Sequence, residues 1–363
     1  MSLMFSEFQL KDITLKNRLV RSATTSYWSD QDGILTNPIL NYYGKLAKGG
    51  VGLIIKGHSY VSEKAKAHTG QSGLSSDKHI PRMKELTELT HSFNTPIIAQ
   101  LNHGGYNCKA DRVTASDYKI PNWEARGATE NDIKKIIKDF ANSAERALQS
   151  GFDGIQIHGA HGYLVSQFLS DIVNRREDEY GGSLEKRSKL LFDIYKETRK
   201  SLGNKALIGI KLNCDDFTEK GGIRIEDSIQ VAKWLKNKGI DFIEISGGGP
   251  EQQAKIRRER AKPEQETGFS EASFGGHAQR IREAVPEIPL ALVDGIRSKS
   301  TIDNLLKYDV VDLISMSRPL IIEPDLPERL KKSQQKSSCI SCLKCISKEA
   351  FGKMMLRCHH LNP

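Results

Sequence analysis

The sequence predicts a single-domain α/β fold, the (β/α)8 TIM barrel, and two observations lead to it. Short apolar runs recur along most of the 363 residues, and helix-like stretches separate most of these runs. Strands that alternate with helices pair in parallel through crossover connections, and eight such units close into a barrel. An open doubly wound sheet is the competing fold, but the sequence lacks the G-x-G-x-x-G turn that typically follows its first strand.

The apolar runs define eight predicted strands. They are 19–23, 51–55, 96–101, 154–157, 206–212, 241–245, 289–293 and 311–316. The helical stretches between them include 79–94, 129–150, 184–202, 225–238 and 271–285. Thr129 followed by Asp132 indicates a helix start with an acidic first turn. We place the barrel at residues 1–330 and a cysteine-containing C-terminal extension at 331–363.

Composition narrows the class of protein. Hydrophobic residues make up 38% and charged residues 27%, and no apolar run approaches the roughly 20 residues of a membrane span. The N-terminal sequence MSLMFSEFQLKD has no apolar signal-peptide core, so we expect a cytoplasmic protein with no membrane partner. The net charge is +9, and much of the excess positive charge lies in the polar segments 255–262 and 329–336. We interpret these segments as solvated surface. No zinc-finger or RNA-binding signature accompanies this charge, so we expect no nucleic-acid partner.

In a barrel, chemistry lies where the strands end and the βα loops begin. The segments that follow the predicted strands are RSATTSYW (21–28), KGHS (56–59), QLNHGG (100–105), HGAHGY (158–163), KLNCDDF (211–217), SGGG (246–249), DGIRS (294–298) and SRP (317–319). The Gly-rich turns of the last strands, with Ser317 and Arg318, suit a bound phosphate, although glycines can also simply make tight turns. Gln100 and Lys211, facing His158, suggest a flat polar ligand above the barrel, although either could be a solvated rim residue.

Three long motifs carry a family resemblance. They are LKNRLVRSATTSYW at 15–28, HGAHGYLVSQFLSDIVNRREDEYGGSLEKR at 158–187 and SRPLIIEPDLPERL at 317–330. On these motifs the chain resembles the Old Yellow Enzyme family, the flavin-dependent ene-reductases. The resemblance covers about nine-tenths of the chain and implies the same barrel, with FMN at its C-terminal mouth.

The resemblance also implies which residues bind the cofactor. Thr25 corresponds to the residue that bonds the O4 edge of the flavin, and Lys211 corresponds to a cation beside its N1/C2 end. Many members have arginine at this position. Lysine keeps the positive charge but lacks the forked pair of N–H donors of a guanidinium group. The implied cofactor-binding residues are Ser22, Ala23, Thr24, Thr25, Gly57, Gln100, Lys211, Gly295, Ser317 and Arg318.

Family members take hydride from NADH or NADPH and reduce a C=C bond conjugated to a carbonyl or nitro group. His158 and His161 resemble the pair that hydrogen-bonds the electron-withdrawing oxygen, which is oxyanion-type stabilisation. Tyr163 resembles the proton donor to the α-carbon, and a phenol is protonated at neutral pH. Tyr27 matches a position beside the substrate. Taken without the family, His-x-x-His could be half a zinc site, and Tyr163 could be a core tyrosine.

Four of the six cysteines lie after residue 336: Cys339, Cys342, Cys345 and Cys358. Their spacing suits iron–sulfur or zinc ligation, and free thiols are the alternative. The segment resembles the 2,4-dienoyl-CoA reductase branch of the family, except that two residues, where that branch usually has three, separate the second and third cysteines. We interpret Cys108 and Cys214 as ordinary free thiols.

The sequence therefore predicts an FMN-dependent, NAD(P)H-oxidising reductase of activated alkenes that acts on a small molecule, and we expect a homo-oligomer. Reduction of dienoyl thioesters or nitro compounds on the same scaffold is one alternative. A non-catalytic flavin-binding sensor is another. The set His158, His161 and Tyr163 favours the enzyme, because a binding module needs no proton donor beside two oxyanion donors.

Overall fold

A computed structural model describes residues 2–120, 123–249, 271–347, 350 and 354–360. The basic segment 255–262, which we interpreted as solvated surface, lies outside these residues. Within the described part of the chain, no helix is long and apolar enough to cross a membrane.

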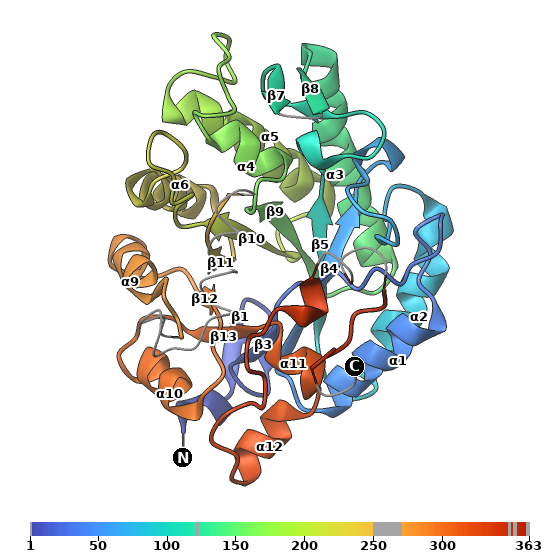
Figure 1. The fold of residues 1–363 in the computed structure, drawn as a ribbon, viewed down its shortest axis with the longest axis vertical. Helices are drawn as coiled ribbons and strands as arrows, with labels where there is room; N and C mark the ends of the chain where they lie inside the picture. The colour runs from blue at the N-terminus through green and yellow to red at the C-terminus, as the bar shows by residue number, and fades with distance from the viewer. Residues whose placement is uncertain (1, 121–122, 250–270, 348–349, 351–353, 361–363) are drawn as a thin grey trace.

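A closed barrel of eight parallel strands forms the centre of the molecule (Figure 1). The strands are β3 (Leu19–Arg21), β4 (Leu53–Tyr60), β5 (Ile97–Asn102), β9 (Gly154–Gly159), β10 (Leu207–Asn213), β11 (Phe242–Ser246), β12 (Leu290–Val293) and β13 (Leu313–Met316). Each pairs with the next along the chain, and β13 closes the circle on β3. The predicted fold is confirmed, and each predicted strand overlaps an observed one.

Helices surround the barrel on its outside (Figure 1). They are α1 (Asn37–Lys48), α2 (Ile80–His91), α3 (Glu130–Gln149), α4 (Leu164–Leu169), α5 (Leu184–Leu202), α6 (Ile225–Lys238), α9 (Gly275–Ala284), α10 (Lys299–Lys307), α11 (Pro319–Ile322) and α12 (Leu326–Lys332). The helix start predicted at Thr129 is confirmed as a capping box. Its hydroxyl accepts from the Asp132 backbone N–H at 3.1 Å, and the Asp132 carboxylate accepts from the Thr129 N–H at 2.9 Å.

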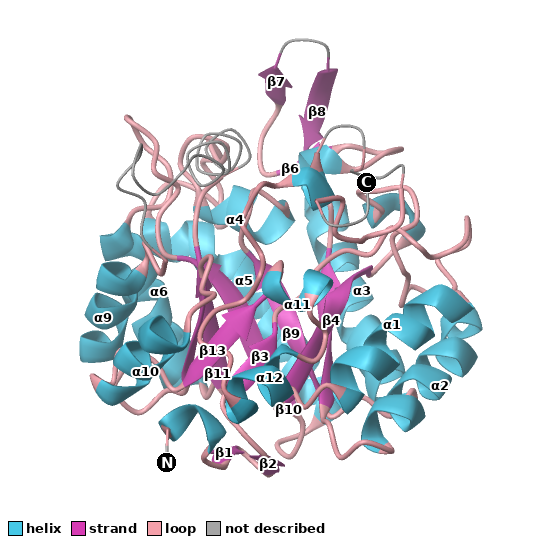
Figure 2. Cartoon of the chain, turned by 60° about the horizontal axis from the view of Figure 1, so that its bottom comes forward, coloured by secondary structure: helices cyan, strands magenta, loops and turns pink. Residues whose placement is uncertain are grey.

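An N-terminal hairpin closes the lower end of the barrel (Figure 2). It consists of β1 (Phe8–Leu10) and β2 (Ile13–Leu15), which pair in antiparallel fashion. Leu10 and Leu15 are fully buried among apolar side chains from the lower ends of the barrel strands. This apolar plug leaves the opposite end, where the strands terminate, as the open mouth.

The loop between β5 and α3 carries a small sheet of β6 (Val113–Thr114), β7 (Tyr118–Ile120) and β8 (Trp123–Gly127), which projects beyond the mouth in Figure 2. Short 3-10 turns complete the structure: Leu3–Phe5, Glu63–Ala65, Asp77–His79, Gly105–Asn107 and Lys344–Ile346.

The C-terminal extension packs against the barrel. The predicted boundary at residue 330 falls inside α12, and the chain beyond this helix returns along the loop that follows β12. There the Ser337 N–H donates to the Arg297 carbonyl at 2.9 Å. Further on, Leu356 is buried and its N–H reaches the Ser26 carbonyl at 3.3 Å, beside the loop that follows β3.

Candidate active site

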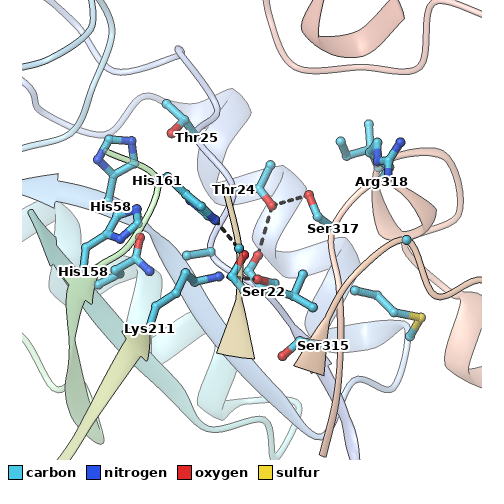
Figure 3. A pocket seen from close by; sticks show the side chains of 18 of the residues that line it. Ser22, Thr24, Thr25, His58, His158, His161, Lys211, Ser315, Ser317 and Arg318 are labelled. Carbon is cyan, nitrogen blue, oxygen red and sulfur yellow. Dashed lines mark hydrogen bonds between the residues drawn. The ribbon is translucent and has the colours of Figure 1, made fainter. Parts of the chain in front are cut away.

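A cavity of about 390 Å³ opens at the mouth of the barrel, where the strands end. The sequence-predicted residues that line it are Ser22, Ala23, Thr24, Thr25, Tyr27, Gln100, His158, His161, Tyr163, Lys211, Gly295, Ser317 and Arg318. Figure 3 shows His58 and His158 on one side of the cavity and Ser317 and Arg318 on the other, with Lys211 and Ser22 between them. The fold thus brings together residues that are almost 300 positions apart.

Gly57 is the predicted site residue that the structure places elsewhere. A Cβ atom at Gly57 would lie 2.3 Å from the Thr24 carbonyl oxygen, so the glycine gives room to the loop after β3. Its N–H donates to the Tyr43 hydroxyl at 2.9 Å, away from the main cavity. The next residue, His58, lines the cavity instead. His58 lies in the strand-end segment 56–59, and the sequence alone predicted no role for it.

A buried polar network forms the floor of the cavity, centred on Glu244 of β11. The Lys211 ammonium lies 3.0 Å from its carboxylate and donates to the Ser22 hydroxyl at 2.9 Å. Ser22 and Gln156 donate to Glu244 at 2.7 Å and 2.9 Å, and Gln100 donates to Gln156 at 2.7 Å. Because β10 is in register with β11, Lys211 lies directly opposite Glu244. Ionic groups are rarely buried without such partners.

The carboxylate of Glu244 stays ionised in this network. Burial by itself would raise its pKa, but the Lys211 ammonium and the hydrogen bonds from Ser22 and Gln156 outweigh it and lower the pKa. Glu244 was not among the site residues predicted from the sequence. The available signal was a single acidic residue inside the mostly apolar strand FIEIS.

Polar groups without protein partners gather at the Arg318 side of the cavity. Within the described residues, Nη1 of Arg318 and the hydroxyl of Ser315 are buried and have no hydrogen-bond partner. Thr24 and Ser317 bridge the loops after β3 and β13 through their hydroxyls, 2.8 Å apart. Buried donors that lack a protein acceptor suit an anionic ligand group, such as a phosphate at the loops after the seventh and eighth strands.

The opposite side of the cavity is aromatic. The His158 ring lies 5.3 Å from the His161 ring and 4.9 Å from the Tyr163 ring, between centroids. Within the described residues Nδ1 of His158 is buried without a hydrogen-bond partner, whereas Nε2 of His161 lies 2.6 Å from the Ser246 hydroxyl. Burial, reinforced by His161, His58 and Lys211, lowers the pKa of His158 well below its usual value. His158 is therefore a neutral imidazole at physiological pH.

Two further histidines, for which the sequence predicted no role, complete this aromatic side. Nδ1 of His58 faces the side-chain amides of Gln71 and Asn102, at 3.0 Å and 2.9 Å. Nε2 of His68 lies 2.7 Å from the Tyr163 hydroxyl. Both histidines come from β4 and the loop that follows it, and nothing in that stretch resembles a catalytic motif.

The structure does not support zinc at His158 and His161. Within the described residues, no group of three or more histidine, cysteine, aspartate or glutamate side chains could hold a metal ion. The four cysteines of the extension are free thiols that line one small separate cavity, which Arg318 also lines. Cys108 and Cys214 are buried free thiols.

Comparisons with known proteins agree with this geometry. A sequence model of the NADH:flavin oxidoreductase / NADH oxidase family matches residues 3–337. The chain belongs to this family. The resemblance to the Old Yellow Enzymes, the barrel fold and an FMN-dependent, NAD(P)H-linked oxidoreductase family are thereby confirmed. The particular likeness of the cysteine segment to the dienoyl-CoA reductase branch stays a prediction.

Relatives of known sequence point the same way. The chain is 30% identical to an NADH oxidase of Thermoanaerobacter brockii over 98% of its own length, but it spans only 55% of that protein. It is 38% identical to an NADPH dehydrogenase of Listeria monocytogenes, with 69% of this chain and 74% of that protein covered.

Solved structures give the same fold. An Old Yellow Enzyme homologue from Zymomonas mobilis superposes with a TM-score of 0.78 at 25% identity, covering 97% of this chain and 99% of that one. A 2-naphthoyl-CoA reductase complex superposes with a TM-score of 0.87 at 23% identity, covering 98% of this chain and 56% of that one.

Proposed function

We propose that this chain reduces the C=C bond of activated alkenes, using hydride from NADH or NADPH by way of bound FMN. The observation that carries the proposal is the convergence of His158, His161 and Tyr163 on one cavity with a polar floor. FMN, when bound, supplies the hydride chemistry. The protein supplies orientation, hydrogen bonds and a proton.

The phosphate group of the cofactor is assigned to the Arg318 side. Arg318 has a buried, unpartnered Nη1, and Ser315 has a buried, unpartnered hydroxyl in the described part of the chain. Gly295 faces Arg318: a Cβ there would lie 3.7 Å from its Nη2. Arginine makes charge-assisted hydrogen bonds with phosphate oxygens, so an anion would satisfy donors that are costly to leave buried and unpaired.

The ring of the cofactor is assigned to the floor between the two sides. Gln100, Lys211 and Thr25 offer donors there, as the family resemblance implies. The hydrogen bond of Lys211 to Ser22 and its ion pair with Glu244 hold its ammonium in one position. A cation held in this way can stabilise negative charge without first reorganising.

The substrate is assigned to the space beneath the imidazoles. Neutral His158, together with His161, would donate hydrogen bonds to the carbonyl or nitro oxygen as negative charge develops on it. Tyr163 would then give its phenolic proton to the α-carbon, and Tyr27 lies at the same side of the cavity. Among the alternatives, a dienoyl thioester would present its thioester carbonyl oxygen to the same histidines, and a nitro compound would present a nitro oxygen.

The test is anaerobic spectroscopy. We expect the purified protein to be yellow, to bleach on addition of NADH or NADPH, and to regain its colour with an enone such as 2-cyclohexenone. Parallel reactions with a nitroalkene and a dienoyl thioester rank the substrate classes. If the protein retains FMN and neither nicotinamide bleaches it, the sensor alternative replaces the enzyme.

A further inference from the structure

Tyr163 has a partner that the proposed chemistry does not yet use. Its hydroxyl lies 2.7 Å from Nε2 of His68, a hydrogen-bond distance, and the two residues are 95 positions apart. Their ring planes are 84° apart with centroids 6.1 Å apart, so His68 meets the phenol through its ring nitrogen and not through its ring face. His68 is only partly buried, and the next residue, Thr69, is exposed.

A buried glutamine fixes the turn that presents His68. The side-chain oxygen of Gln71 accepts from the backbone N–H groups of Ala67 and His68, at 2.8 Å and 3.3 Å. These two donors determine the orientation of the amide, so its NH2 group faces Nδ1 of His58. Gln71 is 1% exposed. Because His68 is hydrogen-bonded to this buried side chain, its position is fixed by the protein core.

The protonation state of His68 suits proton transfer. Burial, with the charge of Lys109 adding to it, lowers the pKa of His68 to about 4, so the ring is neutral at physiological pH. A neutral imidazole carries a proton on one nitrogen and a lone pair on the other. It can therefore release a proton at one side while it gains a proton at the other.

We propose that His68 is the positioning residue that returns a proton to Tyr163 during alkene reduction, an inference that rests on the proposed function. The Tyr163 O–H bond breaks as its proton forms a C–H bond at the substrate α-carbon. In the same step the Nε2–H bond of His68 breaks and restores the phenol, while Nδ1 takes a proton from water and leaves hydroxide to the solvent. One solvent proton is consumed for each alkene reduced. The histidine ends the step neutral, with its proton on Nδ1 instead of Nε2. Proton exchange with water then restores the original tautomer.

The first test counts the protons that move together. Steady-state reduction of 2-cyclohexenone is measured in mixtures of H2O and D2O for the wild type, His68→Gln and His91→Gln. His91 is a surface histidine paired with Asp153, remote from the cavity, and serves as the matched control. We expect a curved dependence of rate on deuterium fraction for the wild type and the control, and a linear one with a rate about 10-fold lower for His68→Gln. Added imidazole should restore part of the rate in His68→Ala.

The second test needs no turnover. In protein labelled with ¹⁵N-histidine, the Nε2 resonance of His68, assigned by its loss in His68→Gln, should shift in Tyr163→Phe while that of His91 stays in place. An active wild type whose His68→Gln variant keeps both the rate and the curvature overturns the relay alone. An unshifted resonance removes the contact on which the relay depends. A wild type that reduces no alkene ends the proposed function, and the relay with it.

Discussion

Neighbouring residues fix the tautomer or the position of the histidines that line the cavity. His58 receives two amide donors at Nδ1 and so carries its proton on Nε2 when neutral. His161 has a φ of +61° and is held by its side chain at Ser246 and by its backbone at Asn213. A non-glycine residue in the left-handed region is uncommon and needs such support. The site is therefore built from residues whose geometry is fixed by their partners.

The first residue-scale prediction concerns the proton donor. Tyr163→Phe removes the phenolic proton and leaves the ring, so reoxidation of the reduced protein by 2-cyclohexenone should slow by about 100-fold or more. Bleaching by the nicotinamide should slow much less, because hydride transfer to the cofactor needs no proton from this phenol. Stopped-flow absorbance separates the two half-reactions. Equal slowing of both would assign Tyr163 a role in binding instead.

The second residue-scale prediction concerns Lys56, which is 2% exposed and has no acidic group within ion-pair distance in the described chain. It donates to the Gly57 carbonyl at 3.0 Å and to the Ser59 hydroxyl at 2.8 Å. Burial lowers its pKa from 10.5 to about 7. Between these values the unfolded chain binds a proton that the folded chain lacks, so stability rises with pH over this window.

Lys56→Met should flatten that rise and increase the Tm at pH 6, where the folded wild type must bury an ammonium group, by about 2 °C or more. Thermal unfolding at pH 6, 7.5 and 9 measures both effects. Lys200→Met, an exposed lysine of α5, is the control and should leave the pH dependence as it is in the wild type. A lower Tm at pH 6 with an unchanged slope would show that the hydrogen bonds of Lys56 outweigh its burial.

Among the elements, the strands combine two functions. Their apolar side chains build the core, and their last residues carry the site. Lys211 on β10 is in register with His158 on β9 and with Glu244 on β11, so parallel pairing places all three at one height in the barrel. The same pairing brings Gly209 opposite Phe242 one layer lower. The interior of the barrel is therefore tightly packed below the cavity.

The element-scale prediction tests this packing. A Cβ atom at Gly209 would lie 1.9 Å from the buried ring of Phe242, so Gly209→Ala should lower the free energy of unfolding by about 1–3 kcal/mol. Gly276→Ala is the matched control, because a Cβ at this exposed position of α9 meets nothing within 4 Å. That substitution should leave stability unchanged or raise it slightly. Chemical denaturation compares the two variants, and similar values for both would contradict the packing argument.

At the scale of the whole molecule, the barrel has one closed end and one open end that carries the candidate active site. The N-terminal hairpin plugs the lower end, and the C-terminal extension crosses toward the loops at the mouth, so that Arg318 lies between the main cavity and the cysteine cavity. Because of this arrangement, Arg318 can bind an anion on one side while its other side faces the cysteines. The chain covers about half of the Thermoanaerobacter brockii relative.

The whole-molecule prediction concerns Cys339, Cys342, Cys345 and Cys358. They line one cavity, and their spacing in the sequence suits ligation of an iron–sulfur cluster or of zinc. We expect protein purified without oxygen to contain iron and acid-labile sulfide, and Cys342→Ala to lose both. Cys214→Ala, a buried thiol outside the extension, is the control. Zinc without iron, or neither metal, would contradict the prediction.

Hydrophobic periodicity alone was sufficient to predict the barrel, because each buried parallel strand is a short apolar run and each covering helix repeats with its own period. The helices α1 and α10 were not named among the predicted helical stretches, although each buries an apolar face in the structure. Most candidate site residues were found because they follow strand ends or lie in long family motifs. Gly57 was assigned to the cofactor because the family resemblance implies it, and the close approach of the Thr24 carbonyl is a packing reason for the glycine that only the structure shows.

By itself, the sequence determined the fold class, the family and the end of the barrel that carries chemistry. These depend on local patterns: which residues are apolar, and which polar residues follow a strand. The tertiary structure alone decided the pairings of Lys211 with Glu244 and of Tyr163 with His68. Each pairing joins residues from different strands or loops, and its energy depends on distance and burial, which are properties of the closed barrel and not of neighbouring positions in the chain.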